Sequence, residues 1–379
     1  MSIQLFAPHF RITQCLEQIK ECMEKGWTGL GFKTIEIEND WKAYTGHHHA
    51  HFLSSNTVGL HLAFKILKDR LGWQDGDEII TTPITFVSTN HSILYENLKP
   101  IFADVDDYLC LDPASVLSLI TPRTRGVIFV GLGGNTGQYE KIIELCRTRS
   151  LSLILDAAHM SGTRLKGKHV GPEADVAIYS YHAVKNLPTA DSGMVCFANA
   201  EDDARARKLS WLGISKDTYT RTISQESYKW IYDVEDIGFK YHGNSIMAAI
   251  ALVQLRYLDH DNAYRRQLAS WYMTALSGTS AVQIVPTAPD CESSRHLFQI
   301  RVANRNELML ALHEHQIYPG VHYRDNTEYS MYAFAKGTCP YAHNASQEII
   351  SLPLHMGLTR DDVVQVCELV SHFTQDNLT

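Results

Sequence analysis

The sequence predicts an α/β protein of fold-type I architecture, in which helices flank a mostly parallel central sheet and a smaller α+β domain follows. Short apolar runs rich in β-branched residues recur along the first two thirds of the chain, and most are separated by segments of helical length. This alternation is typical of a parallel sheet covered by helices on both faces. The chain has 379 residues, which is more than one typical domain needs, so we expect two domains.

The spacing of apolar residues predicts each element of the first domain. A helical pattern begins at Ile12 and ends at Gly26, and another begins near Leu60 after a strand-like run around Phe52. The strands expected after it are residues 78–82, 100–105, 126–130, 151–156, 175–180 and 194–197.

The second domain is expected to follow a long helical pattern that starts at Ile246. The segments after this pattern are more mixed than those of the first two thirds. We therefore predict a large domain at residues 1–250 and a small C-terminal domain at residues 251–379, without a Gly/Pro-rich linker between them.

Composition and charge exclude several classes of protein. The net charge is −8 and no run is rich in Lys or Arg, so no nucleic-acid partner is expected. The longest apolar stretches, such as residues 151–155, are too short to cross a membrane. Residues 1–10 lack the basic and apolar regions of a signal peptide. The eight cysteines form no CxxC pair, which indicates reduced core residues in a cytoplasmic protein.

Three side chains are expected at the carboxyl edge of the sheet, where open α/β sheets bind ligands. Asp156 and Ser180 each end an expected strand, and Lys185 follows in a loop. Taken singly, an Asp at a strand end is often a helix cap and a loop Lys is usually solvated. Together they fit pyridoxal phosphate (PLP), which needs a lysine amine for its aldehyde and a carboxylate beside its pyridine nitrogen.

A phosphate cradle is expected at residues 54–58, Ser-Ser-Asn-Thr-Val, where a strand turns into a helix. Hydroxyl groups and the backbone N–H groups of a helix N-terminus are well suited to a phosphate. The same run is also an ordinary N-cap cluster. It therefore supports the PLP interpretation only in combination with Asp156 and Lys185.

The order and spacing of these segments resemble the DegT/StrS-type sugar aminotransferases, a family of fold-type I PLP enzymes. The resemblance covers nearly the whole chain. Besides the segments of Asp156 and Lys185, it rests on residues 26–31, 55–57, 76–80, 83–87, 100–105, 320–323 and 352–354.

By this resemblance, Lys185 is the Schiff-base lysine and the proton shuttle, and Asp156 pairs with the pyridine nitrogen. His159 takes the place of a Gln or His that contacts the phenolic oxygen of the cofactor. Phe86 takes the place of the aromatic residue stacked on the ring. The phosphate-binding positions are those of Asn56, Thr57, Val58 through its backbone, and Ser180.

The resemblance also implies contacts with a partner subunit and with the substrate. Lys240, within Gly-Phe-Lys-Tyr at residues 238–241, stands where the family reaches the phosphate of the neighbouring subunit. We therefore expect a homodimer with shared active sites. In the family His322 and Tyr323 lie beside the sugar, although the pair also suits a plain strand end.

The implied reaction moves an amino group from an amino acid, with L-glutamate expected, to a nucleotide-linked keto-deoxy sugar. The product is an amino sugar for surface polysaccharide or natural-product glycosylation. Two alternatives stay open, namely an aminotransferase acting on a ketocyclitol or other non-nucleotide keto sugar, and a PLP-binding regulator without catalysis. Lys185 argues against the dehydratase branch of the family, which carries His there.

Three segments depart from the family pattern. Asn56 replaces the Gly of Ser-Gly-Thr, and we expect the turn to survive because Asn tolerates left-handed backbone angles. Asp-Ser-Gly at residues 191–193 replaces acid-Gly-Gly, and a usual His is absent from residues 130–134. The last two departures lie near the substrate side, so they affect the identity of the substrate more than the use of PLP.

Two further motifs suggest other functions. His47, His49 and His51 alternate and would face one side of a strand, but we favour structural or surface histidines over a metal site. Gly-Leu-Gly-Gly at residues 131–134 resembles a dinucleotide-binding loop. It lacks the full GxGxxG spacing and a following acid, so a Rossmann dehydrogenase is a weak alternative.

Overall fold

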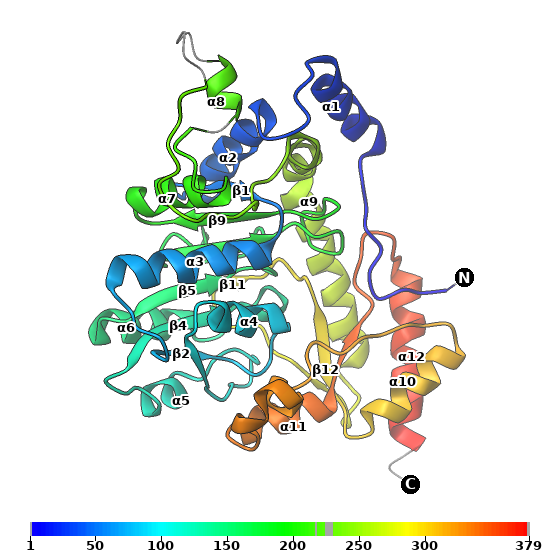
Figure 1. Ribbon diagram of the computed structural model, residues 1–379. Coiled ribbons are helices and arrows are strands. Elements are labelled where there is room, and N and C mark those ends of the chain that lie inside the picture. Colours follow the sequence, from blue (N-terminus) through cyan, green and yellow to red (C-terminus); the bar gives the residue numbers. More distant parts are fainter. Residues whose placement is uncertain (1, 217, 224–229, 377–379) are drawn as a thin grey trace.

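The computed structural model of the protein describes residues 2–216, 218–223 and 230–376 (Figure 1). Its centre is a seven-stranded sheet in the order β1-β9-β8-β5-β4-β2-β3. The pairs among β3, β2, β4, β5 and β8 are parallel, whereas β9 is antiparallel to both β8 and β1. The strands are β1 (His51–Leu53), β2 (Glu78–Thr81), β3 (Lys99–Phe102), β4 (Thr124–Val130), β5 (Ser152–Asp156), β8 (Val176–Ser180) and β9 (Gly193–Phe197). The prediction of a mostly parallel sheet is confirmed.

Helices cover both faces of this sheet because successive side chains of a strand point to opposite faces. In β5, Ile154 belongs to the core under α3, while Leu153 and Leu155 belong to the core on the other face. The first face is covered by α3 (Asn56–Leu71), α4 (Val87–Tyr95) and α7 (Ala200–Ser210). The second is covered by α2 (Phe32–Thr45), α5 (Pro113–Ser118), α6 (Tyr139–Arg149) and the start of α9 (Ser245–Leu276).

The C-terminal part of the chain packs along the second half of α9, as Figure 1 shows. It contains an antiparallel sheet in the order β10-β12-β13 and a separate core that includes Leu268 of α9 and Ile3. Its elements are β10 (Gln283–Ile284), β12 (Phe298–Arg301), α10 (Arg305–Glu314), α11 (Pro340–Glu348), β13 (Ile349–Leu352) and α12 (Arg360–Asp376).

The boundary that we placed at residue 250 lies inside α9, which runs unbroken for 32 residues. This helix contributes Ala248 to a core of the main sheet and Leu268 to the C-terminal core. The division into residues 1–250 and 251–379 stays a prediction. The remaining elements are α1 (Ile12–Glu24), β6 (Arg164–Leu165), β7 (Lys168–His169), α8 (Thr218–Ile223), β11 (Cys291–Glu292) and the short helices η1 (Leu132–Gly134), η2 (Asn326–Glu328) and η3 (Ser330–Ala335).

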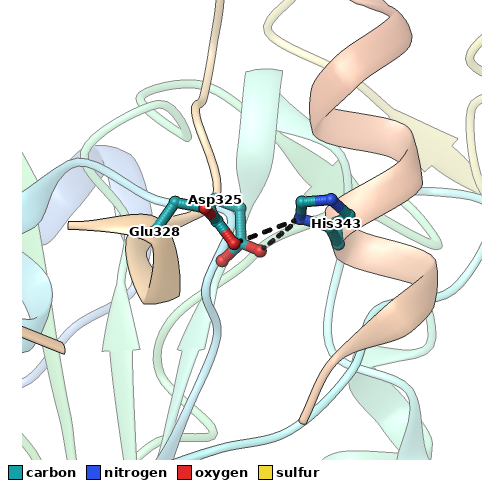
Figure 2. Close-up of side chains that lie close together, drawn as sticks. All are labelled: Asp325, Glu328 and His343. Atoms are coloured by element: carbon teal, nitrogen blue, oxygen red, sulfur yellow. Dashed lines mark hydrogen bonds and ion pairs between the residues drawn. The ribbon is translucent and has the colours of Figure 1, made fainter. Parts of the chain in front are cut away.

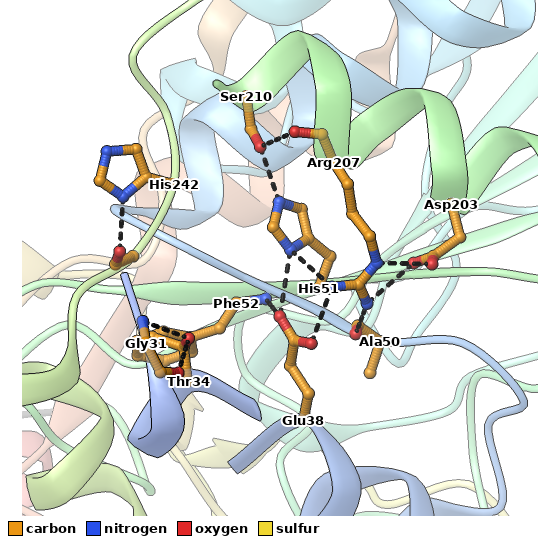
Figure 3. A network of polar contacts seen from close by, with 11 residues as sticks. Gly31, Thr34, Glu38, Ala50, His51, Phe52, Asp203, Arg207, Ser210 and His242 are labelled. Carbon is orange, nitrogen blue, oxygen red and sulfur yellow. Dashed lines mark hydrogen bonds and ion pairs between the residues drawn. The ribbon is translucent and has the colours of Figure 1, made fainter. Parts of the chain in front are cut away.

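A partly buried ionic network fixes β1, the strand that leads into the expected phosphate cradle (Figure 3). The carboxylate of Glu38 accepts hydrogen bonds from the Phe52 backbone N–H at 2.8 Å, from His51 at 3.1 Å and from Arg207 at 2.8 Å. Burial alone raises the pKa of Glu38, but the hydrogen bond from His51 and the charge of Arg207 lower it overall. The position of β1 is therefore tied to α2 and α7.

Two of the histidines of residues 47–51, His47 and His51, have separate structural partners. His47 is buried and its Nε2 lies 3.0 Å from the hydroxyl of Tyr179, while His51 belongs to the network around Glu38. His47 also precedes β1 rather than sharing the strand with His51. These contacts support the structural interpretation of the cluster over the metal-binding one.

The cysteines and helices agree with the expectations from composition. All eight cysteines are unpaired, and all but Cys291 are buried. Within the described residues, every helix is too short or too polar to span a membrane.

Candidate active site

The topology brings the ends of five strands to one edge of the main sheet. Because β1, β2, β4, β5 and β8 run in the same direction, the residues that end or follow them lie together. A cavity of about 390 Å³ opens at this edge. It is lined by Phe6, Ser55, Asn56, Thr57, Thr85, Phe86, Ser88, Val130, Asp156, Ala158, His159, Ser180, His182, Val184, Lys185, Asp191, His296, His322 and Tyr323.

Asp156 ends β5 and presents a buried carboxylate to the cavity. It accepts hydrogen bonds from the Thr89 hydroxyl at 2.7 Å and from the Ala158 backbone N–H at 3.2 Å. Burial raises its pKa in spite of these bonds. A carboxylate in this setting is stabilised by a cation, so Asp156 fits the protonated pyridine nitrogen of PLP.

Lys185 lies in the loop between β8 and β9, where its backbone N–H donates to the His182 carbonyl at 2.9 Å. Burial lowers the pKa of its amine to about 8, and the charge of Asp156 opposes that shift. A substantial fraction of the amine is therefore neutral near physiological pH. The neutral amine is the form that attacks an aldehyde, so Lys185 fits the position of the imine-forming lysine.

The expected phosphate cradle forms at the start of α3. Ser55 caps the helix with an extended backbone, and Thr57 and Ser180 line the cavity beside it. Any side chain at Gly193 would meet the Asn56 backbone N, since a Cβ there would lie at 2.7 Å. This close approach of β9 positions the turn, whose N–H groups and hydroxyls suit a phosphate.

Two of the cradle residues differ from their expected placement. Asn56 was expected to need tolerance of left-handed angles, but it is the first residue of α3 and has no positive φ. Its side chain instead donates to the carbonyl of Ile178 at 3.2 Å. Val58 lies outside the cavity lining, and its N–H donates to the Ser55 hydroxyl at 3.4 Å.

His159 is held in one tautomer by the segment that resembled a dinucleotide loop. That segment forms η1, and the backbone N–H of Gly133 donates to Nδ1 of His159 at 3.1 Å. Burial and the charge of Lys185 keep the pKa of His159 well below its ordinary value. Its proton is therefore on Nε2, which lies 3.2 Å from the hydroxyl of Tyr323.

Phe86, Tyr323 and His322 border the cavity from two separate parts of the chain. Phe86 precedes α4 and is 58% exposed, with its ring centroid 6.2 Å from that of Tyr323. His322 is fixed by Ser351, whose hydroxyl lies 3.0 Å from its Nδ1. Burial and the charge of Lys185 lower the pKa of His322 to about 4, so this ring is neutral.

The segment after Tyr323 is fastened at two points. Nδ1 of His343, on α11, lies 3.3 Å from the carboxylate of Asp325 and 3.6 Å from that of Glu328 (Figure 2). Asn326 then donates to the Thr85 carbonyl at 2.8 Å and accepts from the Asn90 amide at 3.0 Å. The C-terminal segment is thereby joined to the loop that carries Phe86.

Two lining residues with a clear structural role were missed from the sequence. Phe6 comes from the N-terminal segment, and His296 lies just before β12. Their rings stack at a centroid distance of 5.3 Å and an interplanar angle of 9°. Asp156, Ser180 and Lys185 were predicted because each ends or follows a strand of the main sheet. Phe6 and His296 do not follow such a strand, so no comparable signal marks them in the sequence.

Lys240 lies outside the cavity of its own chain. Its ammonium group is 3.3 Å from the centroid of the Trp211 ring, which is a cation–π contact. The geometry therefore separates Lys240 from the ten other residues that the sequence placed at the site, of which nine line the cavity and Val58 adjoins it.

Comparison with known proteins shows the family. Residues 11–371 match the model of the DegT/DnrJ/EryC1/StrS aminotransferase family. The chain is 32% identical over 367 residues to the spore coat polysaccharide biosynthesis protein SpsC of Bacillus subtilis, and the match covers 94% of this chain and 93% of SpsC.

Solved structures give the same result. The fold matches the aminotransferase TlmJ of Streptoalloteichus hindustanus with a TM-score of 0.91 and 30% identity over the whole of both chains. It also matches Spr1654 of Streptococcus pneumoniae, a candidate sugar aminotransferase solved in its PLP form, with a TM-score of 0.91 and 25% identity over the whole of both chains. The chain therefore belongs to the DegT/DnrJ/EryC1/StrS family of PLP-dependent aminotransferases.

Proposed function

We propose that the protein transfers an amino group from L-glutamate to a nucleotide-linked keto-deoxy sugar. The observation that carries this proposal is the placement of the Lys185 amine and the Asp156 carboxylate in one cavity, with a pKa near 8 for the lysine. The similarity to SpsC, a polysaccharide biosynthesis protein, supports an amino sugar as the product.

PLP supplies the electron sink for such a transfer when it is bound. In the proposed site Asp156 holds the proton on the ring nitrogen, and Lys185 moves a proton at the reacting carbon as a general acid–base. His159 offers its Nε2–H to the phenolic oxygen, and Phe86 covers the ring. The phosphate is held by Asn56, Thr57, Ser180 and the N-terminal turn of α3 that includes Val58.

The acceptor side of the cavity is proposed to be formed by His322 and Tyr323. Burial keeps the pKa of Tyr323 above its usual range, so its hydroxyl stays protonated. Because Nε2 of His159 carries the ring proton and has no lone pair, the Tyr323 hydroxyl cannot donate to it, and the hydrogen of Tyr323 is left to donate to a substrate oxygen. His322 contributes a neutral ring beside it.

A partner subunit is proposed to complete the site. Lys185 is the one Lys or Arg among the described residues that line the cavity, whereas glutamate and the PLP phosphate are both anions. Further cations that bind these anions therefore have to come from outside this lining. Hydrogen bonds between ionised groups are stronger than those between neutral groups. Lys240 is the proposed contribution of the partner.

The surface near Lys240 suits such a dimer. The segment shortly before Lys240 exposes several apolar side chains, and exposed apolar patches often mark protein–protein interfaces. These are Trp230, Ile231, Tyr232, Val234 and Ile237. We therefore propose that the protein is a homodimer in the cytoplasm and that its cysteines are reduced.

Initial-rate kinetics test the proposed reaction. Glutamate is combined with a panel of UDP- and dTDP-linked keto-deoxy sugars, with a free ketocyclitol as the comparison. Two half-reactions at one site give parallel double-reciprocal lines. Intersecting lines, amine consumption without an aminated sugar by mass spectrometry, or amination of the ketocyclitol alone would contradict the proposal.

A further inference from the structure

We propose that His296 is a substrate-recognition residue whose unprotonated Nε2 accepts a hydrogen bond from a hydroxyl group of the sugar acceptor. His296 lines the cavity that holds Lys185 and Asp156. The inference rests on the keto-sugar substrate proposed above. It is carried by a buried chain of hydrogen bonds that orients this one imidazole.

The direction of that chain is set by two backbone carbonyls, which can only accept. Asn262 donates through its amide to the carbonyl of Ser161 at 2.9 Å. Asn186 donates through its amide nitrogen to the carbonyl of Ser294 and to the Asn262 oxygen, each at 2.7 Å. The amide oxygen of Asn186 is therefore the atom that faces Nδ1 of His296, at 3.0 Å. Because this oxygen is an acceptor, His296 has to donate through Nδ1.

The imidazole carries no second proton. His296 is 1% exposed, and burial, together with the neighbouring His159 and the charge of Lys185, keeps its pKa well below the ordinary value. With the single proton fixed on Nδ1, Nε2 retains its lone pair. The ring lies between Phe6 at 5.3 Å and His159 at 4.3 Å, measured between centroids, which fixes its plane.

This acceptor complements the donors already at the site. His159 presents Nε2–H, Tyr323 presents its hydroxyl hydrogen, and Lys185 presents its amine. A sugar hydroxyl has a hydrogen to donate, so it bonds to a bare Nε2. The carboxylates of glutamate can only accept hydrogen bonds, and its amino group is the group that reacts at the cofactor, so glutamate has no free donor for Nε2 of His296. His296 therefore acts in the half-reaction with the sugar and not in the half-reaction with glutamate.

The substitution His296→Asn separates these roles. The Asn amide nitrogen takes the place of Nδ1 and keeps a donor toward Asn186, while the acceptor at Nε2 is lost. His47→Asn is the matched control, because it also shortens a buried histidine but lies outside the cavity. His296→Gln tests rescue, since its longer side chain returns an amide oxygen to the region of Nε2.

Each half-reaction is measured in single turnover by cofactor absorbance, with glutamate on the PLP form and UDP- or dTDP-linked keto-deoxy sugars on the amino form. His296→Asn should lower the second-order rate constant of the sugar half-reaction by about 10-fold, which corresponds to the loss of one net hydrogen bond. The rate constant of the glutamate half-reaction should stay within about twofold of the wild-type value. His296→Gln should recover part of the loss, and His47→Asn should change neither half-reaction. Equal slowing of both half-reactions, or of neither, would overturn the assignment.

A spectroscopic readout tests the tautomer without a sugar. In protein labelled with ¹⁵N-histidine and assigned with His296→Asn, the His296 resonances should show a protonated Nδ1 and a bare Nε2 from pH 6 to 8. A protonated Nε2 would overturn the inference while leaving the proposed reaction intact. A wild-type enzyme that converts glutamate but aminates none of the sugars would remove the proposed acceptor and this inference together.

Discussion

The amine of Lys185 and the carboxylate of Asp156 face one cavity and act on each other's protonation in opposite senses. Burial lowers the pKa of the amine to about 8, and the charge of Asp156 limits that decrease. Burial raises the pKa of Asp156, and the charge of Lys185 is one of the effects that limit the increase. The charge of each group therefore favours the ionised form of the other.

Lys185 is expected to carry the cofactor. The purified protein should be yellow, and borohydride should fix PLP covalently to the peptide that contains Lys185. Lys185→Ala should abolish this labelling and the transfer reaction while leaving the fold unchanged. Label on another lysine would show that the assignment is wrong.

Attachment of PLP to the apoprotein is expected to depend on pH. The neutral amine is the nucleophile, so the rate should rise with pH and level off above about 8, the pKa of Lys185. Because the charge of Asp156 raises this pKa, Asp156→Asn should shift the midpoint to lower pH. Stopped-flow absorbance measures both profiles, and a midpoint that stays fixed in the variant would contradict the coupling.

Asp156→Asn is expected to reduce kcat by about 10²–10³-fold, the usual effect of losing one preorganised electrostatic contact at a reacting centre. The stability of the apoprotein should change in the opposite direction. The folded pKa of Asp156 is raised by burial, so its favourable neutral form is lost as the pH rises through that pKa.

Apo Asp156→Asn should therefore have a higher Tm than the apo wild type at pH 7–8. The difference should shrink as the pH falls through the raised pKa of Asp156, because the wild-type carboxyl then takes up a proton. Calorimetry across this range checks the sign, and added PLP should reverse the order at pH 7–8.

Two inactive variants are expected to complement each other. If Lys240 serves the partner's site, a heterodimer of Lys185→Ala and Lys240→Ala subunits has one intact site and one doubly defective site. Mixing should therefore restore activity. If the two sites are independent, each heterodimer should reach up to about half the activity of a wild-type dimer. No recovery in a heterodimer verified by mass would count against sharing.

The sequence predicted the sheet and the residues at its strand ends, because buried strands leave continuous apolar runs. Asp156 and Ser180 end such runs and Lys185 follows one closely, so all three could be expected at one edge of the sheet. Phe6 and His296 reach the cavity through tertiary packing, and no local pattern marks them. The role of residues 131–134 in orienting His159 also depends on a contact between the segments that follow β4 and β5, which spacing does not reveal.

The fastening of Asn326 to Thr85 and Asn90 has a consequence for biosynthesis. A ribosome releases the segments that carry Asp156 and Lys185 well before it releases His322, Tyr323 and Asn326. One wall of the cavity is therefore absent until most of the polypeptide has been made. A nascent chain that ends near residue 250 lacks His322 and Tyr323, so that side of the cavity can form only after residues 322–326 have left the ribosome.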